Sequence, residues 1–247
     1  MTNTTQDFVL NGKVTLHQYK EGYRMAVDTV LLAASVRGST GGRALDMGCG
    51  VGGAMLCLAY RCPELGIDGL ELQPHLAQLA AKNIHANGFE GRLRVFEGDI
   101  QKPPAEIEPE SYTHVFANPP FMQDDRGHHP PDQSKRLAHV ESHTNLADWV
   151  QAALGFCKRK GSITIIQRAD RLDELMAALG RDVGEVTIFP IWPKAGENAN
   201  RVIVRARKGI KTPMRLTNGM TLHNADGSYT ALADEVLNGG GLYLRET

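Results

Sequence analysis

The chain has 247 residues and a mass of 27.0 kDa, a size that fits a single α/β domain. Hydrophobic residues make up 42% and charged residues 22% of the sequence, so the composition is globular and excludes fibrous and disordered classes. The formal net charge of −1 and the isoelectric point near 6.8 exclude an overall basic excess that would bind nucleic acid diffusely.

Helical and strand-like segments alternate along most of the chain, which is typical of an α/β fold. The first helix is expected at residues 29–36, with Asp28 as its N-cap. Strands are then expected at residues 43–47, 66–71, 92–97, 114–117 and 162–167, and helices at residues 54–61, 74–87, 146–158 and 171–179. Residues 186–192 and 201–207 are expected to form a terminal antiparallel pair, and residues 229–237 a last short helix. We therefore predict seven strands, most of them in βα alternation.

The segment Asp46-Met-Gly-Cys-Gly-Val-Gly-Gly53 ends a predicted strand and opens a helix. Closely spaced glycines let the backbone approach a ligand that side chains would block, here at Gly48 and Gly50. The acid lies on the strand itself, where Asp46 would repel a pyrophosphate and suits a cation such as an ammonium or a sulfonium. The pattern therefore differs from a dinucleotide-binding motif. The alternative is a glycine turn that serves packing only.

Two more acids follow the next strands. Glu71 ends the second strand of the alternation, where a carboxylate can accept hydrogen bonds from both hydroxyls of a ribose. Asp99 ends the third, where it can accept from the exocyclic amine of an adenine. Acids at three consecutive strand ends indicate a ligand site, and the alternative is acids that only cap helices.

The motif Asn118-Pro-Pro-Phe121 comes at the end of the fourth strand, where open α/β sheets place ligand chemistry. Pro119 and Pro120 fix the local backbone, which can aim the Asn118 amide oxygen and the Pro119 carbonyl at one point. Two convergent acceptors suit a planar NH2 group, because accepting both hydrogens frees its lone pair in the transition state. Phe121 offers a flat face for stacking a base. The alternative is a turn followed by a core Phe.

With this layout, the chain resembles the class I S-adenosylmethionine-dependent methyltransferases that methylate planar amines, over residues 16–207. The resemblance implies a Rossmann-like fold: a seven-stranded, mostly parallel sheet with its last strand antiparallel and helices on both faces. It also implies S-adenosylmethionine as cofactor, with Asp46 near its methionine end, Glu71 on its ribose and Asp99 near its adenine. The catalytic residues would be Asn118, Pro119, Pro120 and Phe121, and the cofactor-binding residues Asp46, Gly48, Gly50, Glu71, Asp99 and Asn118.

Residues 18–33, Gln-Tyr-Lys-Glu-Gly-Tyr-Arg-Met-Ala-Val-Asp-Thr-Val-Leu-Leu-Ala, look like the opening of the bacterial tRNA1(Val) adenine N6-methyltransferase family. Residues 229–235 are similar to the end of those proteins. This resemblance implies a cytoplasmic enzyme that methylates adenine in RNA, at a base beside the anticodon of a valine tRNA. We expect one methyltransferase domain over residues 1–247, with residues 1–40 as an extension on the cofactor and substrate side and residues 208–247 as a C-terminal extension.

Two other activities use the same chemistry. A protein glutamine N5-methyltransferase is disfavoured because those proteins usually carry a helical domain before the glycine turn, and this chain has only a short segment there. An rRNA guanine N2-methyltransferase commonly has a duplicated domain. A non-catalytic scaffold is disfavoured because every expected polar position is occupied.

Basic residues gather in two places. One is a long segment without apolar periodicity at residues 122–143, of a length typical of functional or disordered loops. The other is at residues 201–215, which contain no acid. Together they predict a phosphate-binding rim around the pocket mouth, and the alternative is a solvated strand face. The candidates for RNA contact are Arg126, Lys135, Arg136, Arg205 and Arg207.

The sequence indicates neither a membrane span nor a metal site. Its longest apolar run, at residues 29–36, is far below the ~18 residues that a membrane span needs, and residues 1–10 lack the apolar segment of a secretory signal. The 4 cysteines form no CxxC pair and have no matching His spacing, so we expect free thiols in a reducing cytosol. The oligomeric state is not specified.

Overall fold

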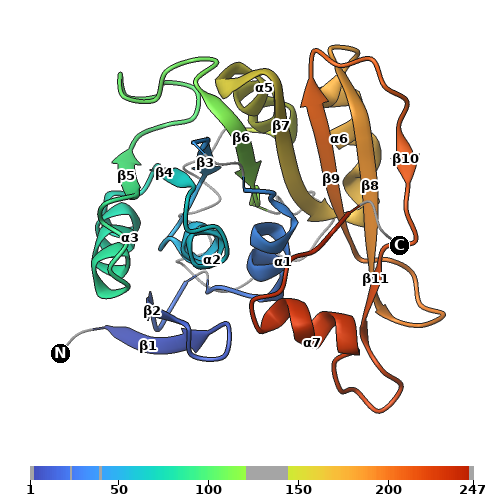
Figure 1. The fold of residues 1–247 in the computed structure, drawn as a ribbon, viewed down its shortest axis with the longest axis horizontal. Helices are drawn as coiled ribbons and strands as arrows, with labels where there is room; N and C mark the ends of the chain where they lie inside the picture. The colour runs from blue at the N-terminus through green and yellow to red at the C-terminus, as the bar shows by residue number, and fades with distance from the viewer. Residues whose placement is uncertain (1–2, 23, 39–40, 121–143, 245–247) are drawn as a thin grey trace, which may run out of the picture.

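The computed structural model describes residues 3–22, 24–38, 41–120 and 144–244 (Figure 1). Its α-helices are α1 (Val27–Ser35), α2 (Gly53–Arg61), α3 (Pro74–Ala86), α5 (Leu146–Phe156), α6 (Leu172–Leu179) and α7 (Ala231–Leu237), and a short 3-10 helix, η1 (Ala169–Arg171), precedes α6. Its strands are β1 (Thr4–Val9), β2 (Val14–Tyr19), β3 (Arg43–Met47), β4 (Gly66–Glu71), β5 (Leu93–Glu97), β6 (Tyr112–Ala117), β7 (Cys157–Arg168), β8 (Val183–Lys194), β9 (Arg201–Lys208), β10 (Arg215–Leu216) and β11 (Met220–His223).

One sheet forms the centre of the molecule, with the strand order β10-β8-β9-β7-β6-β3-β4-β5 and with β11 beside β8. Parallel pairing joins β3 to β4 and β6, β4 to β5, and β6 to β7. Strand β9 runs antiparallel to both of its neighbours, β7 and β8. The long strands therefore form the expected mostly parallel sheet with the last one antiparallel, and the short strands β10 and β11 extend it.

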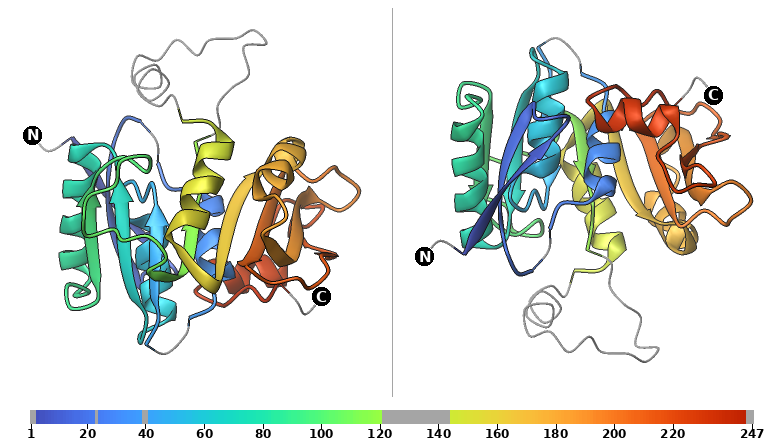
Figure 2. Two further views of the ribbon diagram at one scale, coloured as in Figure 1. Left: turned by 90° about the horizontal axis from the view of Figure 1, so that it is seen from above. Right: turned by 90° about the horizontal axis from the view of Figure 1, so that it is seen from below.

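Helices cover both faces of this sheet (Figure 2). One hydrophobic cluster gathers side chains from α1, α2 and α7 on one face, and a second gathers side chains from α5 and α6 on the other. Adjacent residues of β3 serve opposite clusters: Ala44 belongs to the first and Leu45 to the second, as the alternation of a strand requires. Both sheet faces are thus buried, which confirms the predicted α/β architecture.

A hairpin at the N-terminus was not predicted. Strands β1 and β2 pair antiparallel with each other and not with the main sheet, and β2 lies against α3. Asn11 and Gly12 in the connecting turn both have positive φ, 54° and 79°. An Asn-Gly pair between two alternating segments is a recognised hairpin signal, so the sequence did contain the evidence for this element.

The predicted N-cap of the first helix was wrong. Helix α1 begins at Val27 with Ala26 as its N-cap, so Asp28 lies inside the first turn. A carboxylate in the first turn still interacts favourably with the helix dipole. It also binds the guanidinium of Arg201 at 2.7 Å and so joins the first helix to β9.

Two other boundaries shift because of capping. Helix α5 ends at Phe156, where the backbone turns to extended conformation, so β7 begins inside the range 146–158 that was predicted as helix. The last helix begins at Ala231 and not at residue 229, because the Thr230 hydroxyl caps it by accepting from the backbone N–H of Ala233 at 3.2 Å.

Within the described residues, no helix has the length and apolar character needed to cross a membrane. The same residues contain no group of three or more His, Cys, Asp or Glu side chains placed to hold a metal ion. The cysteine thiols Cys49, Cys57, Cys62 and Cys157 are free, as expected.

Candidate cofactor and catalytic site

A glycine turn (residues 48–53) leads from the end of β3 into α2. Gly48, Gly50 and Gly52 have positive φ values of 67°, 57° and 89°, a conformation that side chains disfavour. A Cβ placed on Gly48 would lie only 2.6 Å from Cη2 of Trp149, whereas a Cβ on Gly50 would meet nothing within 4 Å. The backbone at Gly50 therefore faces open space, where a ligand can approach it.

Glu71 holds this turn from the neighbouring strand. Its carboxylate accepts from the backbone N–H of Gly50 at 2.8 Å and from that of Gln73 at 2.9 Å. The side chain is buried, and this burial raises the pKa of Glu71 even though both hydrogen bonds favour the ionised form. The acid predicted to bind a ribose thus lies directly beside the glycine turn.

Asp46 is a buried acid at the end of β3. One carboxylate oxygen accepts from the backbone N–H of Met55 at 3.1 Å, and no Lys, Arg or His among the described residues forms an ion pair with it. Burial raises the pKa of Asp46 well above its usual range, and the nearby charge of Glu71 raises it further. Because no cation among the described residues compensates this carboxyl group, a cationic ligand would favour its ionised form.

The strand register brings Asn118 to the same edge. Met47, the last residue of β3, pairs with Ala117, the last residue of β6, so Gly48 and Asn118 are the next residues of two neighbouring parallel strands. Asn118 is half-buried, Pro119 is buried and Pro120 is exposed. Phe121 lies outside the described residues.

Asp99 belongs to this edge as well. It follows β5, whose last residue Glu97 pairs with Glu71. The Asp99 carboxylate accepts from the backbone N–H of Gln101 at 2.8 Å, which holds the chain as it leaves the strand. The structure therefore brings together, at the carboxyl ends of β3 to β6, the predicted residues Asp46, Gly48, Gly50, Glu71, Asp99 and Asn118.

Arg205 and Arg207 lie elsewhere. They pair with Thr164 and Ser162 of β7, whereas the carboxyl end of that strand is Arg168. Arg207 binds the Glu185 carboxylate at 3.0 Å, and burial lowers the pKa of Arg205. The register thus places both arginines away from the pocket mouth to which the sequence analysis assigned them.

The other residues predicted for that rim, Arg126, Lys135 and Arg136, lie outside the described part of the chain. Contact of any of the five basic residues with RNA stays a prediction.

Trp149 is a site residue that the sequence analysis missed. It lies in the first turn of α5, is 8% exposed, and packs its ring on Gly48. A capping box fixes the start of this helix, because the Asn145 and Asp148 side chains each accept from the other's backbone N–H. Asn followed three residues later by an acid was the available signal for this arrangement.

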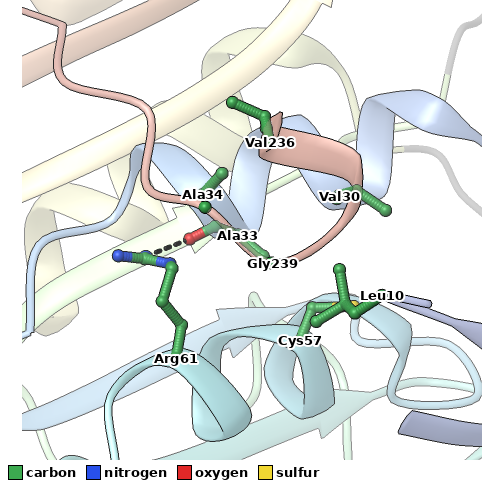
Figure 3. Close-up of a pocket in the computed structure, with 9 residues that line it drawn as sticks. Leu10, Val30, Ala33, Ala34, Cys57, Arg61, Val236 and Gly239 are labelled. Atoms are coloured by element: carbon green, nitrogen blue, oxygen red, sulfur yellow. Dashed lines mark hydrogen bonds between the residues drawn. The ribbon is translucent and has the colours of Figure 1, made fainter. Parts of the chain in front are cut away.

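A small hollow away from the glycine turn lies between α1, α2, α7 and the hairpin turn (Figure 3). Its volume of about 10 Å³ holds about one water molecule. The Arg61 side chain, which lines it, donates to the carbonyls of Ala33 and Val36 and so caps the end of α1. This hollow is too small for a cofactor, and Arg61 has a structural role there.

Comparison with known proteins identifies the family. The family model described as "Methyltransferase small domain" matches residues 24–171. The chain belongs to this family. The match includes the glycine turn, Glu71 at the end of β4, Asp99 after β5, and the segment after β6.

Two relatives carry the name tRNA1(Val) (adenine(37)-N6)-methyltransferase. The one from Aeromonas hydrophila is 27% identical over 84% of this chain and 85% of its own length. The one from Porphyromonas gingivalis is 31% identical over 62% of this chain and 61% of its own length. A crystal structure of a predicted O-methyltransferase from Agrobacterium tumefaciens matches with a TM-score of 0.73 and 25% identity, over 87% of this chain and 98% of that one.

These findings confirm the expected fold and enzyme class. The protein is a methyltransferase of the class I Rossmann-like fold, and its methyl donor is S-adenosylmethionine.

Proposed function

We propose that this methyltransferase acts on the exocyclic N6 amine of an adenine in RNA, at a base beside the anticodon of a valine tRNA. The observation that carries the proposal is the register of β3 and β6, which puts the Asn118-Pro119-Pro120 acceptors next to the glycine turn. The names of the two relatives support the choice of substrate. We treat residues 1–247 as one catalytic domain.

The side chains at the glycine turn fit the cofactor. The uncompensated Asp46 carboxylate suits its positive charge, the Glu71 carboxylate lies where ribose hydroxyls can donate to it, and Gly50 leaves room above the backbone. Asp99 would accept from the adenine amine. When bound, S-adenosylmethionine supplies a methyl group activated by its positively charged sulfur.

Asn118 and Pro119 would prepare the methyl acceptor. The Asn118 amide oxygen and the Pro119 carbonyl accept the two hydrogens of the adenine amine, which moves its lone pair out of conjugation and towards the methyl carbon. These acceptors gain strength as positive charge develops on the nitrogen, so they stabilise the transition state more than the ground state. Pro119 and Pro120 keep the backbone rigid, and Phe121 would stack against the base.

The test is transfer of labelled methyl groups to total tRNA, followed by digestion to nucleosides and chromatography. We expect label in N6-methyladenosine and its loss when the valine tRNA is removed. Label only in guanosine or only in protein glutamine would assign one of the two other activities. Label on a ribose or another oxygen would instead follow the description of the Agrobacterium protein.

A tRNA substrate also implies a cytoplasmic enzyme. RNA contact through Arg126, Lys135 and Arg136 belongs to the same proposal, because these residues closely follow Asn118 in the sequence. Binding of RNA that does not weaken as salt is raised would contradict phosphate contacts by these residues.

A further inference from the structure

Asn83, on the face of α3 that meets the hairpin, bonds three backbone groups with its side-chain amide, and its oxygen also lies 3.1 Å from Nδ1 of the His17 ring. Its oxygen accepts from the backbone N–H of His17 at 2.8 Å, and its NH2 donates to the carbonyl of His17 and to that of Val51, both at 2.9 Å. The side chain is fully buried. Asn83 therefore joins β2 of the N-terminal hairpin to the middle of the glycine turn.

Asn87, one helical turn later, repeats the two backbone hydrogen bonds to the hairpin but not the bond to the glycine turn. Its oxygen accepts from the backbone N–H of Thr15 at 2.9 Å, and its NH2 donates to the carbonyl of Thr15 at 2.7 Å. Four residues along a helix rise about 6 Å and two residues along a strand about 6.7 Å, so the two amides bind β2 much as a neighbouring strand would. The second hydrogen of Asn87 goes to the carbonyl of Asn83 and does not reach the glycine turn.

The glycine turn is fixed mainly by groups outside it. Glu71 holds the N–H of Gly50, and Ala80 of α3 lies close to Gly52, 3.4 Å from where a Cβ would be. Glycines with positive φ have little conformational preference of their own, so such anchors decide where the peptide groups of the turn point. The bond from Asn83 to the Val51 carbonyl fixes the peptide between these two anchors.

We propose that Asn83 is a positioning residue for the cofactor: it holds the glycine turn in its binding shape and couples that shape to the N-terminal hairpin. The inference rests on the proposed role of the turn in binding S-adenosylmethionine and not on the identity of the methyl acceptor. Asn87 is its matched control, because it makes the same pair of backbone hydrogen bonds to the hairpin and none to the turn.

The experiment compares Asn83→Ala, Asn83→Asp and Asn87→Ala in the full chain. Asn83→Asp keeps the acceptor for the backbone N–H of His17 and removes the NH2 group that donates to the carbonyls of His17 and Val51. Asn87→Ala removes hairpin contacts alone, so the comparison of the two variants isolates the contact to the glycine turn. Calorimetry gives the Kd of S-adenosylmethionine, urea unfolding gives the stability, and steady-state kinetics give KM for the cofactor and kcat. Asp46→Ala serves as an independent test of the turn itself.

We expect both Asn83 variants to raise the Kd and the KM for S-adenosylmethionine about fivefold or more. This fold-change corresponds to the net contribution of one lost hydrogen bond. Their kcat at saturating cofactor should stay near that of the wild type. Asn87→Ala should lower stability and leave the Kd unchanged.

Equal changes of Kd in the Asn83 and Asn87 variants, or no change in either, would overturn the proposal. Loss of folding in both Asn83 variants would also overturn it, by marking the amide as a purely structural contact. If Asp46→Ala leaves the Kd unchanged, the assignment of the cofactor site itself fails, whatever Asn83 does.

Discussion

Asn118 is the residue on which the proposed chemistry depends most. Its amide oxygen would accept a hydrogen whose partial charge grows in the transition state, so Asn118→Ala should lower kcat by about 10²–10³-fold, as loss of one such preorganised group does. The Kd of S-adenosylmethionine should change little. Single-turnover methylation of tRNA measures the chemical step, and cofactor binding by calorimetry is the control. A folded Asn118→Ala protein with a near-normal single-turnover rate would refute this role.

Asp46 predicts how cofactor binding depends on pH. Burial raises the pKa of Asp46 well above the ordinary value of 3.8, so the free protein takes up a proton at a higher pH than an exposed aspartate does. A cationic ligand favours the ionised carboxylate. The affinity for S-adenosylmethionine should therefore be highest at pH values above the raised pKa of Asp46 and should fall as the pH drops through that pKa.

Calorimetry over a range of acidic to neutral pH measures this dependence. Asp46→Asn should bind the cofactor more weakly at neutral pH and should lose the dependence, since the variant has no proton to release at this position. An identical pH profile in wild type and variant would mean that another group, such as Glu71, controls binding.

The sequence predicted those site residues whose role follows from their residue type and from their position relative to a predicted strand. Acids at the ends of consecutive strands and prolines after an asparagine are visible as local patterns in the sequence. Asn83 and Trp149 have none that names their partner, because Asn83 bonds to His17, 66 residues earlier in the chain, and Trp149 meets Gly48 only through the packing of α5. Only the folded backbone shows that they contact the glycine turn.

Among the secondary-structure elements, the central strands are joined by a buried acid. Asp68 of β4 is fully buried and accepts two hydrogen bonds from Arg43 of β3, both at 2.6 Å, and two from Arg94 of β5, both at 3.0 Å. The Tyr112 hydroxyl of β6 donates to it at 3.0 Å. These bonds tie together the four strands that carry the site residues at their other ends.

We expect Asp68→Asn to lower the free energy of unfolding by about 2–3 kcal/mol. Breaking a fully buried ion pair costs about 3–5 kcal/mol, and the cost is smaller here because the Arg43 and Arg94 side chains are 39% and 53% exposed. Urea unfolding at neutral pH measures the difference. A loss below about 0.5 kcal/mol, the range of ordinary surface substitutions, would contradict the proposed importance of this network.

Asp68 also makes the free energy of unfolding depend on pH in the acidic range. Burial opposes ionisation of Asp68, but the hydrogen bonds and charges of Arg43 and Arg94 outweigh it and lower its pKa below the ordinary 3.8. A depressed pKa gives stability that is present above the unfolded value and is lost as pH falls through the folded value. The difference in stability between wild type and Asp68→Asn should therefore shrink below about pH 4.

Helices and strands were predicted correctly where the segment has its own hydrophobic periodicity. They were missed or misplaced where pairing with a neighbouring strand determines the structure. The βα units and the antiparallel pair β8 and β9 followed from alternating composition and turn residues. Strands β10 and β11 are short and owe their structure to β8, with which they pair. Strand β7 begins early because its first residue, Cys157, pairs with Tyr112 of β6, ahead of an irregular register between Tyr112 and His114. No local pattern reveals this pairing.

In the whole molecule, exposed cations gather at the end of the sheet opposite to the site. We define the basic surface as Lys158, Arg159, Lys160, Arg181 and Lys211, all exposed and none in an ion pair with another described residue. Hydrogen bonds hold these segments together. The backbone N–H of Gly209 donates to the Asp182 carbonyl at 2.7 Å, and the Arg207 guanidinium donates to the Lys160 carbonyl at 3.0 Å. The net charge of −1 hides this local excess.

The sequence alone could not show at which end of the sheet the basic residues 201–215 lie, so their assignment to the pocket mouth was wrong. The sequence shows that residues 201–215 are basic, but the direction of β9, antiparallel to its neighbours, decides which end of the sheet receives them. Lys160 lies eight residues before Arg168 on β7, which corresponds to roughly 26 Å at about 3.3 Å per residue. A small base analogue cannot span that distance, whereas a tRNA can.

If the substrate is tRNA, the basic surface should therefore contribute to its binding through phosphate contacts remote from the methylated base. Lys158→Ala/Lys160→Ala should raise the Kd for tRNA and reduce the slope of log Kd against log salt by about 0.7–0.9 for each phosphate that is no longer neutralised. The matched control, Lys13→Ala/Lys82→Ala, removes two lysines that are also exposed, one from the hairpin and one from α3. Fluorescence titration of labelled tRNA at several salt concentrations measures both slopes, and kcat at saturating tRNA should be unchanged in both variants. Equal slopes in the two double variants would exclude the basic surface from tRNA binding while leaving the methyl-transfer chemistry at Asn118 intact.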